Sequence, residues 1–168
     1  VTHDQGEAMT MSDRVAVFNN GKILQCAAPK DLYDSPNCSF VAEFVGENNR
    51  FSGKIERVEG STCAVRIADG TVILAERVEG LATGAAVRVY VRPERIIVGP
   101  DAAQQANSFP ARVADATFLG DHTRLKVEMP GNADVTVKRN FFGDTGTLDP
   151  DEETTIGWPL KASRLVAA

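Results

Sequence analysis

The sequence has 168 residues, enough for one ordinary domain or two small ones with a real hydrophobic core. Hydrophobic residues make up 43% and charged residues 24%, and no stretch approaches the roughly 20 unbroken apolar residues of a membrane-spanning helix, so a disordered chain and a transmembrane helix are both excluded. The net charge is −5, from 18 basic and 23 acidic residues, and no basic block is present. Nucleic acid is therefore disfavoured as a partner.

The cysteines and the start of the chain carry two further expectations. Cys26, Cys38 and Cys63 are odd in number and lack CxxC spacing, which fits neither a disulfide framework nor a metal site; we expect buried or half-buried side chains. No basic segment followed by an apolar core marks the chain for export, so we expect a cytoplasmic protein. The chain starts at Val1 and its first methionine, Met9, falls inside a patterned segment, so we expect a piece of a longer chain.

Composition divides the chain near Asn49. The first 49 residues carry 3 basic and 7 acidic side chains, whereas residues 50–168 carry 15 and 16 and hold most of the glycine and β-branched residues. The second part therefore has the composition of short strands joined by tight turns.

In the first part, patterns predict three helices and a hairpin. Asp4 is placed to cap the first helix, and Asn20-Gly21 between two strand-like runs is a strong hairpin signal because both residues tolerate positive φ. The expected helices are Gln5–Ser12, Pro29–Tyr33 and Cys38–Val45, and the expected hairpin strands are Arg14–Phe18 and Lys22–Cys26.

In the second part, apolar and β-branched runs predict ten strands. A polar stretch, Pro100–Ser108, separates the first five from the rest and is expected to be a surface loop or linker. The expected strands are Gly53–Val58, Thr62–Ile67, Thr71–Ala75, Ala86–Arg92, Arg95–Val98, Ala111–Phe118, Thr123–Met129, Asp134–Lys138, Thr154–Trp158 and Ser163–Val166.

The strands of the second part hint at an internal duplication. Phe51–Ile55 resembles Phe109–Val113, and Thr62–Val65 resembles Thr123–Lys126 in the same order. Two units of this size are each too small to bury a sheet face alone. We therefore expect paired or intertwined small barrels of the OB type.

Residues that could carry chemistry are few. The chain has two histidines and contains no G-x-S-x-G elbow, no phosphate-binding loop, no G-x-G-x-x-G and no H-E-x-x-H. The strongest candidate is His3, which stands just before the first predicted helix. His122, beside Gly120-Asp121 in a predicted turn, is expected to be solvated. Two scaffold roles are also expected: Arg92 and Glu94 pair to pin a strand edge, and Trp158 forms a core or dimer contact.

The context of His3 carries a family resemblance. The string V-T-H-D-Q-x-E-A-x-x-M-S-D-R at the start of the chain resembles the segment after the last catalytic strands of ABC-transporter ATPase subunits. Val91–Glu94 and Phe118–Asp121 resemble markers of the transport-associated OB domain that follows the ATPase in many importers. The run Phe44–Asn49 is most similar to subunits of spermidine/putrescine importers. Gly6 departs from the family pattern, which more often has glutamate there.

The resemblance implies a fold and a function. The expected fold is mainly β: an OB-like regulatory, transport-associated β-barrel domain at residues 50–168, preceded by a short α/β remnant of the ABC nucleotide-binding domain at residues 1–49. His3 would be the catalytic and cofactor-binding residue, as a switch that contacts the γ-phosphate of ATP, with no metal ligand in this chain.

The same resemblance implies partners. The intact subunit would use ATP and Mg²⁺, pair with a second copy, and act on membrane permease subunits at the cytoplasmic face of the membrane. On the family pattern the imported solutes would be polyamines. The fragment alone would bind no cofactor and would not be catalytic, and residues 1–49 would be less stable than the rest.

Two alternatives remain open. One is a stand-alone module that captures a small ligand, an oxyanion, between duplicated OB-like units. The other is a hydrolase that uses His3 and Asp4 on a metal, which lacks a third nearby ligand.

Overall fold

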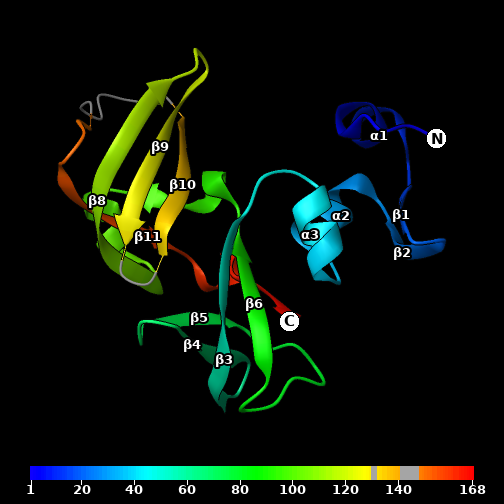
Figure 1. Ribbon diagram of the computed structural model, residues 1–168, viewed down its shortest axis with the longest axis horizontal. Coiled ribbons are helices and arrows are strands. Elements are labelled where there is room, and N and C mark those ends of the chain that lie inside the picture. Colours follow the sequence, from blue (N-terminus) through cyan, green and yellow to red (C-terminus); the bar gives the residue numbers. More distant parts are fainter. Residues whose placement is uncertain (130–131, 141–147) are drawn as a thin grey trace.

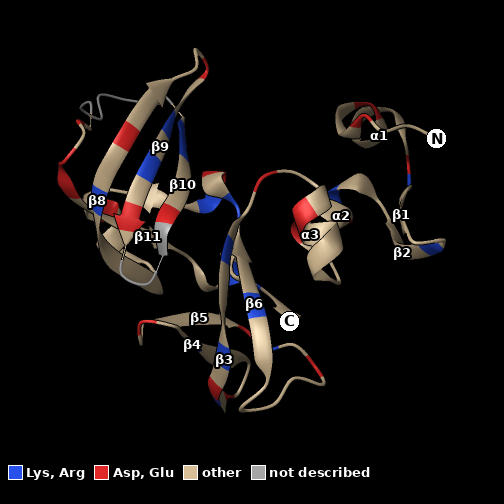
Figure 2. Ribbon diagram, viewed as in Figure 1, with Lys and Arg blue, Asp and Glu red and all other residues tan. Residues whose placement is uncertain are grey.

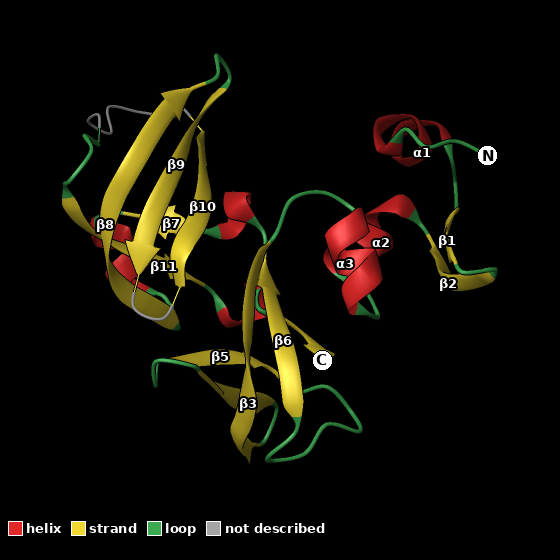
Figure 3. Cartoon of the chain, viewed as in Figure 1, coloured by secondary structure: helices red, strands yellow, loops and turns green. Residues whose placement is uncertain are grey.

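The computed structural model describes residues 1–129, 132–140 and 148–168. Its helices and one small hairpin lie at the N-terminal end, and the remaining chain forms two curled β-sheets (Figure 1). Strands dominate the described part, and its α-helices lie in the first 45 residues, while short 3-10 turns lie beside the sheets (Figure 3). The predicted fold class, a mainly β chain with OB-like sheets behind a short α/β segment, is confirmed.

The N-terminal segment follows its sequence signals closely. Asp4 caps the first helix, since its carboxylate accepts a hydrogen bond of 3.0 Å from the backbone N–H of Glu7. Asn20 and Gly21 both have positive φ, 48° and 75°, as the hairpin turn requires. The elements are α1 (Gln5–Met11), β1 (Val15–Asn19), β2 (Lys22–Ala27), α2 (Pro29–Asp34) and α3 (Ser39–Phe44).

The rest of the chain, from Asn49 onward, is called the β domain below. It holds two five-stranded sheets with the strand orders β12-β6-β3-β4-β5 and β10-β9-β8-β11-β7. The first contains β3 (Asn49–Glu59), β4 (Thr62–Ile67), β5 (Val72–Glu76), β6 (Ala86–Val91) and β12 (Arg164–Ala167). The second contains β7 (Ile97–Val98), β8 (Asn107–Phe118), β9 (His122–Met129), β10 (Asn132–Asn140) and β11 (Glu153–Trp158).

The two sheets are repeats of one pattern. In each, a long strand pairs on one side with the next strand and on the other side with the fourth. Both long strands carry a β-bulge at the same place, after Ile55 in β3 and after Val113 in β8, which are the residues that the sequence repeat aligns. The predicted internal duplication is therefore confirmed.

The repeats are intertwined through their last strands. β7 follows β6 along the chain but pairs with β11 in the second sheet, and β12 follows β11 but pairs with β6 in the first sheet. Each sheet thus depends on a strand supplied by the other half. Neither repeat is complete alone.

Two asparagines at equivalent positions clamp the sheets together. Asn49 starts β3 and exchanges hydrogen bonds of 2.8 Å with both the N–H and the carbonyl of Thr136 in β10. Asn107 starts β8 and does the same with Leu74 in β5, at 2.7 and 2.9 Å. Both asparagines are buried, so each replaces a backbone partner that the curled edge strand would otherwise lack.

The core of the β domain lies between the two sheets. Trp158 is fully buried, stacks on Phe51 with ring centroids 5.8 Å apart, and contacts Phe109 at 5.3 Å. Its indole N–H donates to the hydroxyl of Ser163 at 2.9 Å, which satisfies its polar atom. The expected core role of Trp158 is confirmed.

One strand prediction and one loop prediction were wrong, and both lie where the chain crosses from the first sheet to the second. Arg95–Val98 was expected to be a strand, but Pro93–Arg95 forms a 3-10 turn, η1, and only the two residues of β7 pair. Pro100–Ser108 was expected to be a surface loop, but Pro100–Gln104 forms a second turn, η2, and Asn107 already belongs to β8. A Cβ at Gly157 of β11 would lie 2.4 Å from the Ala102 carbonyl, so η2 is packed directly on the sheet.

Side-chain predictions were corrected at two places. Cys26 is exposed, whereas Cys38 is half-buried and Cys63 is buried as expected, because Cys26 lies on an edge of the small hairpin. His122 was expected to be solvated, but its side chain is only 16% exposed and its Nδ1 lies 2.6 Å from a carboxylate oxygen of Asp121.

Candidate functional site

His3 lies in the exposed turn that leads into α1. The turn is braced on both sides of it: the backbone N–H of Asp4 donates to the Thr2 hydroxyl at 3.0 Å, and that hydroxyl donates to Glu7 at 2.8 Å. Within the described residues, the imidazole of His3 has no hydrogen-bond partner. The structure therefore holds the backbone of His3 and leaves its ring available.

A second polar centre lies where the N-terminal segment meets the β domain. Arg92 follows β6, is 7% exposed, and donates to three backbone carbonyls: those of Val45, Glu47 at 3.1 Å and Tyr33 at 2.8 Å. These carbonyls come from the end of α2 and the segment after α3. One side chain therefore fastens two parts of the N-terminal segment to the β domain.

The guanidinium of Arg92 also lies over the ring of Tyr33, 3.9 Å from its centroid. Burial lowers the pKa of Arg92 from its ordinary value, but a guanidinium keeps its charge at any physiological pH. The cation is compensated in direct contact by carbonyl dipoles and an aromatic face. The expected Arg92–Glu94 pair was wrong, because Arg92 faces the N-terminal segment.

Glu94 serves the same junction through another contact. Its carboxylate accepts a hydrogen bond of 2.6 Å from the hydroxyl of Tyr33. Burial and this hydrogen bond raise the pKa of Tyr33 to about 12. Tyr33 is thus held by two residues: Arg92 lies over the face of its ring, and Glu94 accepts a hydrogen bond from its hydroxyl.

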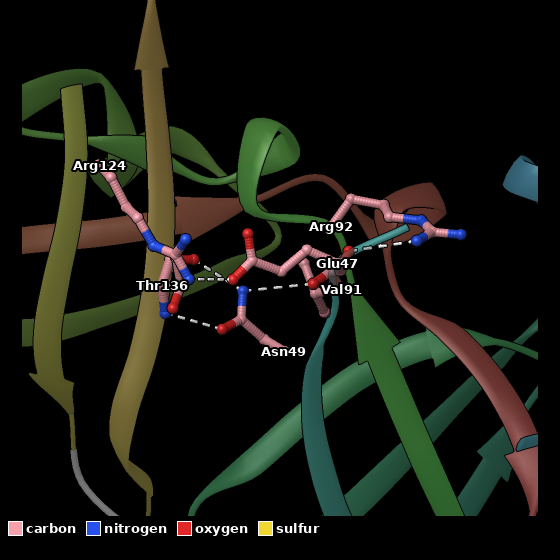
Figure 4. Close-up of polar contacts among 6 residues, drawn as sticks. All are labelled: Glu47, Asn49, Val91, Arg92, Arg124 and Thr136. Carbon is pink, nitrogen blue, oxygen red and sulfur yellow. Dashed lines mark hydrogen bonds and ion pairs between the residues drawn. The ribbon is translucent and has the colours of Figure 1, made fainter. Parts of the chain in front are cut away.

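The connection between α3 and β3 is fixed at both of its ends (Figure 4). Glu47 pairs with Arg124 of β9, while its carbonyl accepts from Arg92. Two residues further on, Asn49 bonds the Val91 carbonyl at 3.3 Å and clamps Thr136. Within three residues the connection therefore makes polar contacts with both sheets. A displacement of α3 would disturb these contacts in both sheets.

α3 itself packs on the outer side of the first sheet. Ala42, Tyr90 and Val166 form a small buried cluster of their own. The Tyr90 hydroxyl donates to Glu43 at 2.7 Å, and Arg88 donates to the Ser39 hydroxyl at 2.9 Å. The hydrogen bond from Tyr90 lowers the pKa of Glu43, which keeps the Glu43 carboxylate ionised.

Chemical machinery is sparse in the described residues. They contain no group of three or more His, Cys, Asp or Glu side chains that could hold a metal ion. None of the helices in that part is long and apolar enough to cross a membrane. The hydrolase alternative needs both His3 and Asp4 as metal ligands. The Asp4 carboxylate instead caps α1, which argues against that alternative.

The role of His3 stays a prediction, and the junction at Arg92 was not predicted from the sequence. The string Val91–Glu94 was a recognised marker, yet the partners of Arg92 are backbone carbonyls, which leave no trace in a sequence. The only sequence signal for the junction was an arginine, Arg92, directly before a proline that starts a turn.

Comparison with known proteins defines the class of the β domain. Residues 89–166 match the TOBE domain. A solved structure of the cytoplasmic molybdate-binding protein ModG superimposes with a TM-score of 0.60 at 14% identity, over 71% of this chain and 96% of that one, and so shares its fold. The TOBE match covers the second sheet, half of β6 and most of β12, but not β3–β5. The predicted division at residue 49 stays a prediction.

The chain as a whole has more specific relatives. It is 39% identical to the spermidine/putrescine import ATP-binding protein PotA of Rubrobacter xylanophilus, over 96% of this chain and 42% of that protein. It is 37% identical to PotA of Trichormus variabilis, over 93% of this chain and 41% of that protein. The chain thus spans less than half the length of these relatives, and its resemblance to importer ATP-binding subunits of the spermidine/putrescine type is confirmed.

Proposed function

We propose that the chain is the C-terminal part of the ATP-binding subunit of an ABC importer, and that its β domain regulates the ATPase or holds its subunits together. The observation that carries this proposal is the junction at Arg92. It fastens residues 29–48 to the β domain by buried hydrogen bonds, so movement in one part is transmitted to the other.

His3 is the proposed contact with nucleotide. An exposed imidazole on a braced turn fits a phosphate oxygen as a hydrogen-bond partner, and the contact would be lost once the γ-phosphate leaves. ATP and Mg²⁺ would supply the phosphoryl-transfer chemistry in the complete subunit. The present sequence contains no phosphate-binding loop. This chain would therefore contribute the histidine that senses the γ-phosphate and not the groups that hold the phosphates.

The proposed partners are a second ATP-binding subunit and the permease subunits of the importer. Polyamines are the proposed solutes, since the relatives named above are spermidine/putrescine import proteins. The proposed location is the cytoplasmic face of the membrane, reached through the permease.

The oxyanion-binding module is the second candidate. It is favoured by the fold shared with ModG, whose name describes a molybdate-binding protein. It gives no role to the N-terminal segment or to the free imidazole of His3. Binding of molybdate to the isolated chain, at one site and at micromolar concentration, would favour this candidate.

The test uses the complete subunit assembled with its permease in proteoliposomes. His3→Ala is expected to lower ATP hydrolysis and spermidine uptake by about 100-fold or more, because a group that contacts the reacting phosphate is lost. His122→Ala is the matched control and is expected to leave both rates within about twofold, since His122 is the first residue of β9 in the β domain and is not part of the turn that holds His3. ATP-driven uptake that is unchanged in His3→Ala would overturn the proposed role.

A further inference from the structure

A pocket of about 470 Å³ lies beside the junction, between α2, η1, the end of β5 and the turn η3 (Leu160–Ala162). Its volume is in the range of sites for small organic ligands. Six of its lining side chains are cationic: Lys30, Arg77, Arg92, Arg95, Lys161 and Arg164.

Only two carboxylates, Asp34 and Glu76, line the same pocket. Six positive and two negative groups leave a local charge of +4, in a chain whose net charge is −5. The basic residues come from separate elements and converge on one concave surface. Figure 2 marks the Lys and Arg positions of the chain in blue along the ribbon.

The positive charge of the pocket is poorly compensated by direct contacts. Asp34 is shared by Lys30 at 3.7 Å and Arg95 at 3.5 Å. Arg92 and Arg164 donate to backbone carbonyls, which carry no net charge. Within the described residues, no side-chain hydrogen bond or ion pair is made by Arg77 or Lys161.

Like charges brought together in a partly enclosed site repel one another, because the surrounding protein screens them less than water does. An anion bound among them relieves this repulsion. Arginine donors suit phosphate and carboxylate groups in particular, since their planar forks bond two oxygens at once. The apolar part of the lining, which includes Val78 and Leu165, would accept the carbon skeleton of an organic anion.

We propose that this pocket binds a small anion with two or more negative charges, carried on phosphate or carboxylate groups. Arg77 and Lys161 of the β domain would supply the free donors, with Lys30 and Arg95 contributing once the anion competes with Asp34. Because Lys30 belongs to α2 and the others to the β domain, the bound anion would bridge the two regions. The proposal does not depend on the ATPase assignment.

The test uses ¹H–¹⁵N correlation spectra of the 168-residue chain, recorded at constant ionic strength. Pyrophosphate is the phosphate probe and citrate is the carboxylate probe. One of them is expected to produce saturable shifts at amides of the pocket with a dissociation constant of about 1 mM or tighter. The stronger of the two then identifies the ligand chemistry.

Two double variants separate a built site from general charge attraction. Arg77→Ala/Lys161→Ala is expected to weaken binding of the better probe by about tenfold or more, since two charge-assisted contacts are lost. Lys54→Ala/Lys126→Ala removes the same charge from exposed positions on β3 and β9 and is expected to change binding by less than about twofold. All four side chains are exposed, so both variants should fold, and their circular dichroism spectra check this.

Three results would overturn the proposal. They are the absence of saturable shifts from either probe up to about 10 mM, shifts that map outside the pocket, and equal weakening in both double variants. A bound anion should also slow amide exchange in α2, because it binds the docked arrangement and not the undocked one. Unchanged exchange in α2 would overturn the bridging role.

Discussion

The N-terminal segment and the β domain differ in how their apolar residues are used. In the described part of the chain, the main cluster of the β domain contains 21 buried residues, whereas that of the N-terminal segment contains four: Val17, Leu32, Val41 and Val45. Large exposed apolar side chains are also unequally shared. Among the described residues there are nine such side chains, and six of them lie in the N-terminal segment: Val1, Met11, Phe18, Ile23, Phe40 and Phe44.

This difference in buried apolar residues indicates which region stabilises the other. The β domain buries its apolar surface between its own two sheets, so it supports itself. The N-terminal segment buries little and depends on contacts that the β domain provides, above all Arg92 and the cluster of Ala42, Tyr90 and Val166. We therefore expect residues 1–49 to open locally at a lower free energy than the β domain.

The largest expected effect comes from the centre of the β domain. Trp158→Ala should lower the free energy of unfolding of the β domain by about 3–5 kcal/mol, because it removes a fully buried ring and its contacts with Phe51 and Phe109. Chemical denaturation followed by circular dichroism measures the change. Phe118→Ala, at a side chain that is 66% exposed, is the control and should change stability far less. A loss below about 1 kcal/mol for Trp158→Ala would contradict a shared core between the sheets.

The matching change in the other region is Leu32→Ala, at the centre of the four-residue cluster. It should cost about 2–4 kcal/mol locally, since Leu32 is fully buried. Amide exchange should speed up across β1, β2 and α2 while the β domain keeps its protection. Faster exchange throughout both sheets would show instead that the two regions unfold as one unit.

Removing the tie between the regions should have a smaller but more specific effect. Arg92→Met keeps much of the packing and leaves the carbonyls of Tyr33, Val45 and Glu47 without their donor, at about 1 kcal/mol each. We expect faster exchange in residues 29–48 with the β-domain transition unchanged. Arg57→Met, at an exposed arginine of β3, is the matched control. Equal exchange in both variants would argue against the junction.

The internal repeat offers a comparison within the β domain. Asn49→Ala and Asn107→Ala should each lower stability by about 1–3 kcal/mol, because each removes a pair of buried hydrogen bonds to the opposite sheet. Each asparagine also makes a third hydrogen bond at 3.3 Å, Asn49 to the Val91 carbonyl and Asn107 to the Ser163 hydroxyl, so the two losses should be similar. Denaturation midpoints measure both. A neutral effect at either position would mean that the clamp is replaced by water.

The sequence predicted local structure better than it predicted partners. Hairpin turns, helix caps and most strands were predicted correctly because Asn20-Gly21, Asp4 and alternating apolar residues act over a few positions. The strand swap and the packing of η2 on Gly157 were not predictable in this way, since they depend on contacts between residues more than 50 positions apart. The same reason explains why the carbonyl partners of Arg92 were not predicted.

The smallest expected effect is a pH dependence at the junction. The pKa of Tyr33 is raised to about 12 from 10.0, so its hydroxyl stays protonated and donates to Glu94 up to about pH 10. This stabilisation declines as the pH rises from 10 to 12. Tyr33→Phe keeps the ring beneath Arg92 and lacks the hydroxyl. The difference in free energy of unfolding between wild type and Tyr33→Phe should therefore stay constant up to about pH 10 and shrink above it. Tyr90 also has a raised pKa, caused by burial, but it titrates in both proteins and cancels. A difference that is unchanged up to pH 12 would mean that the Tyr33 hydroxyl does not contribute to the junction.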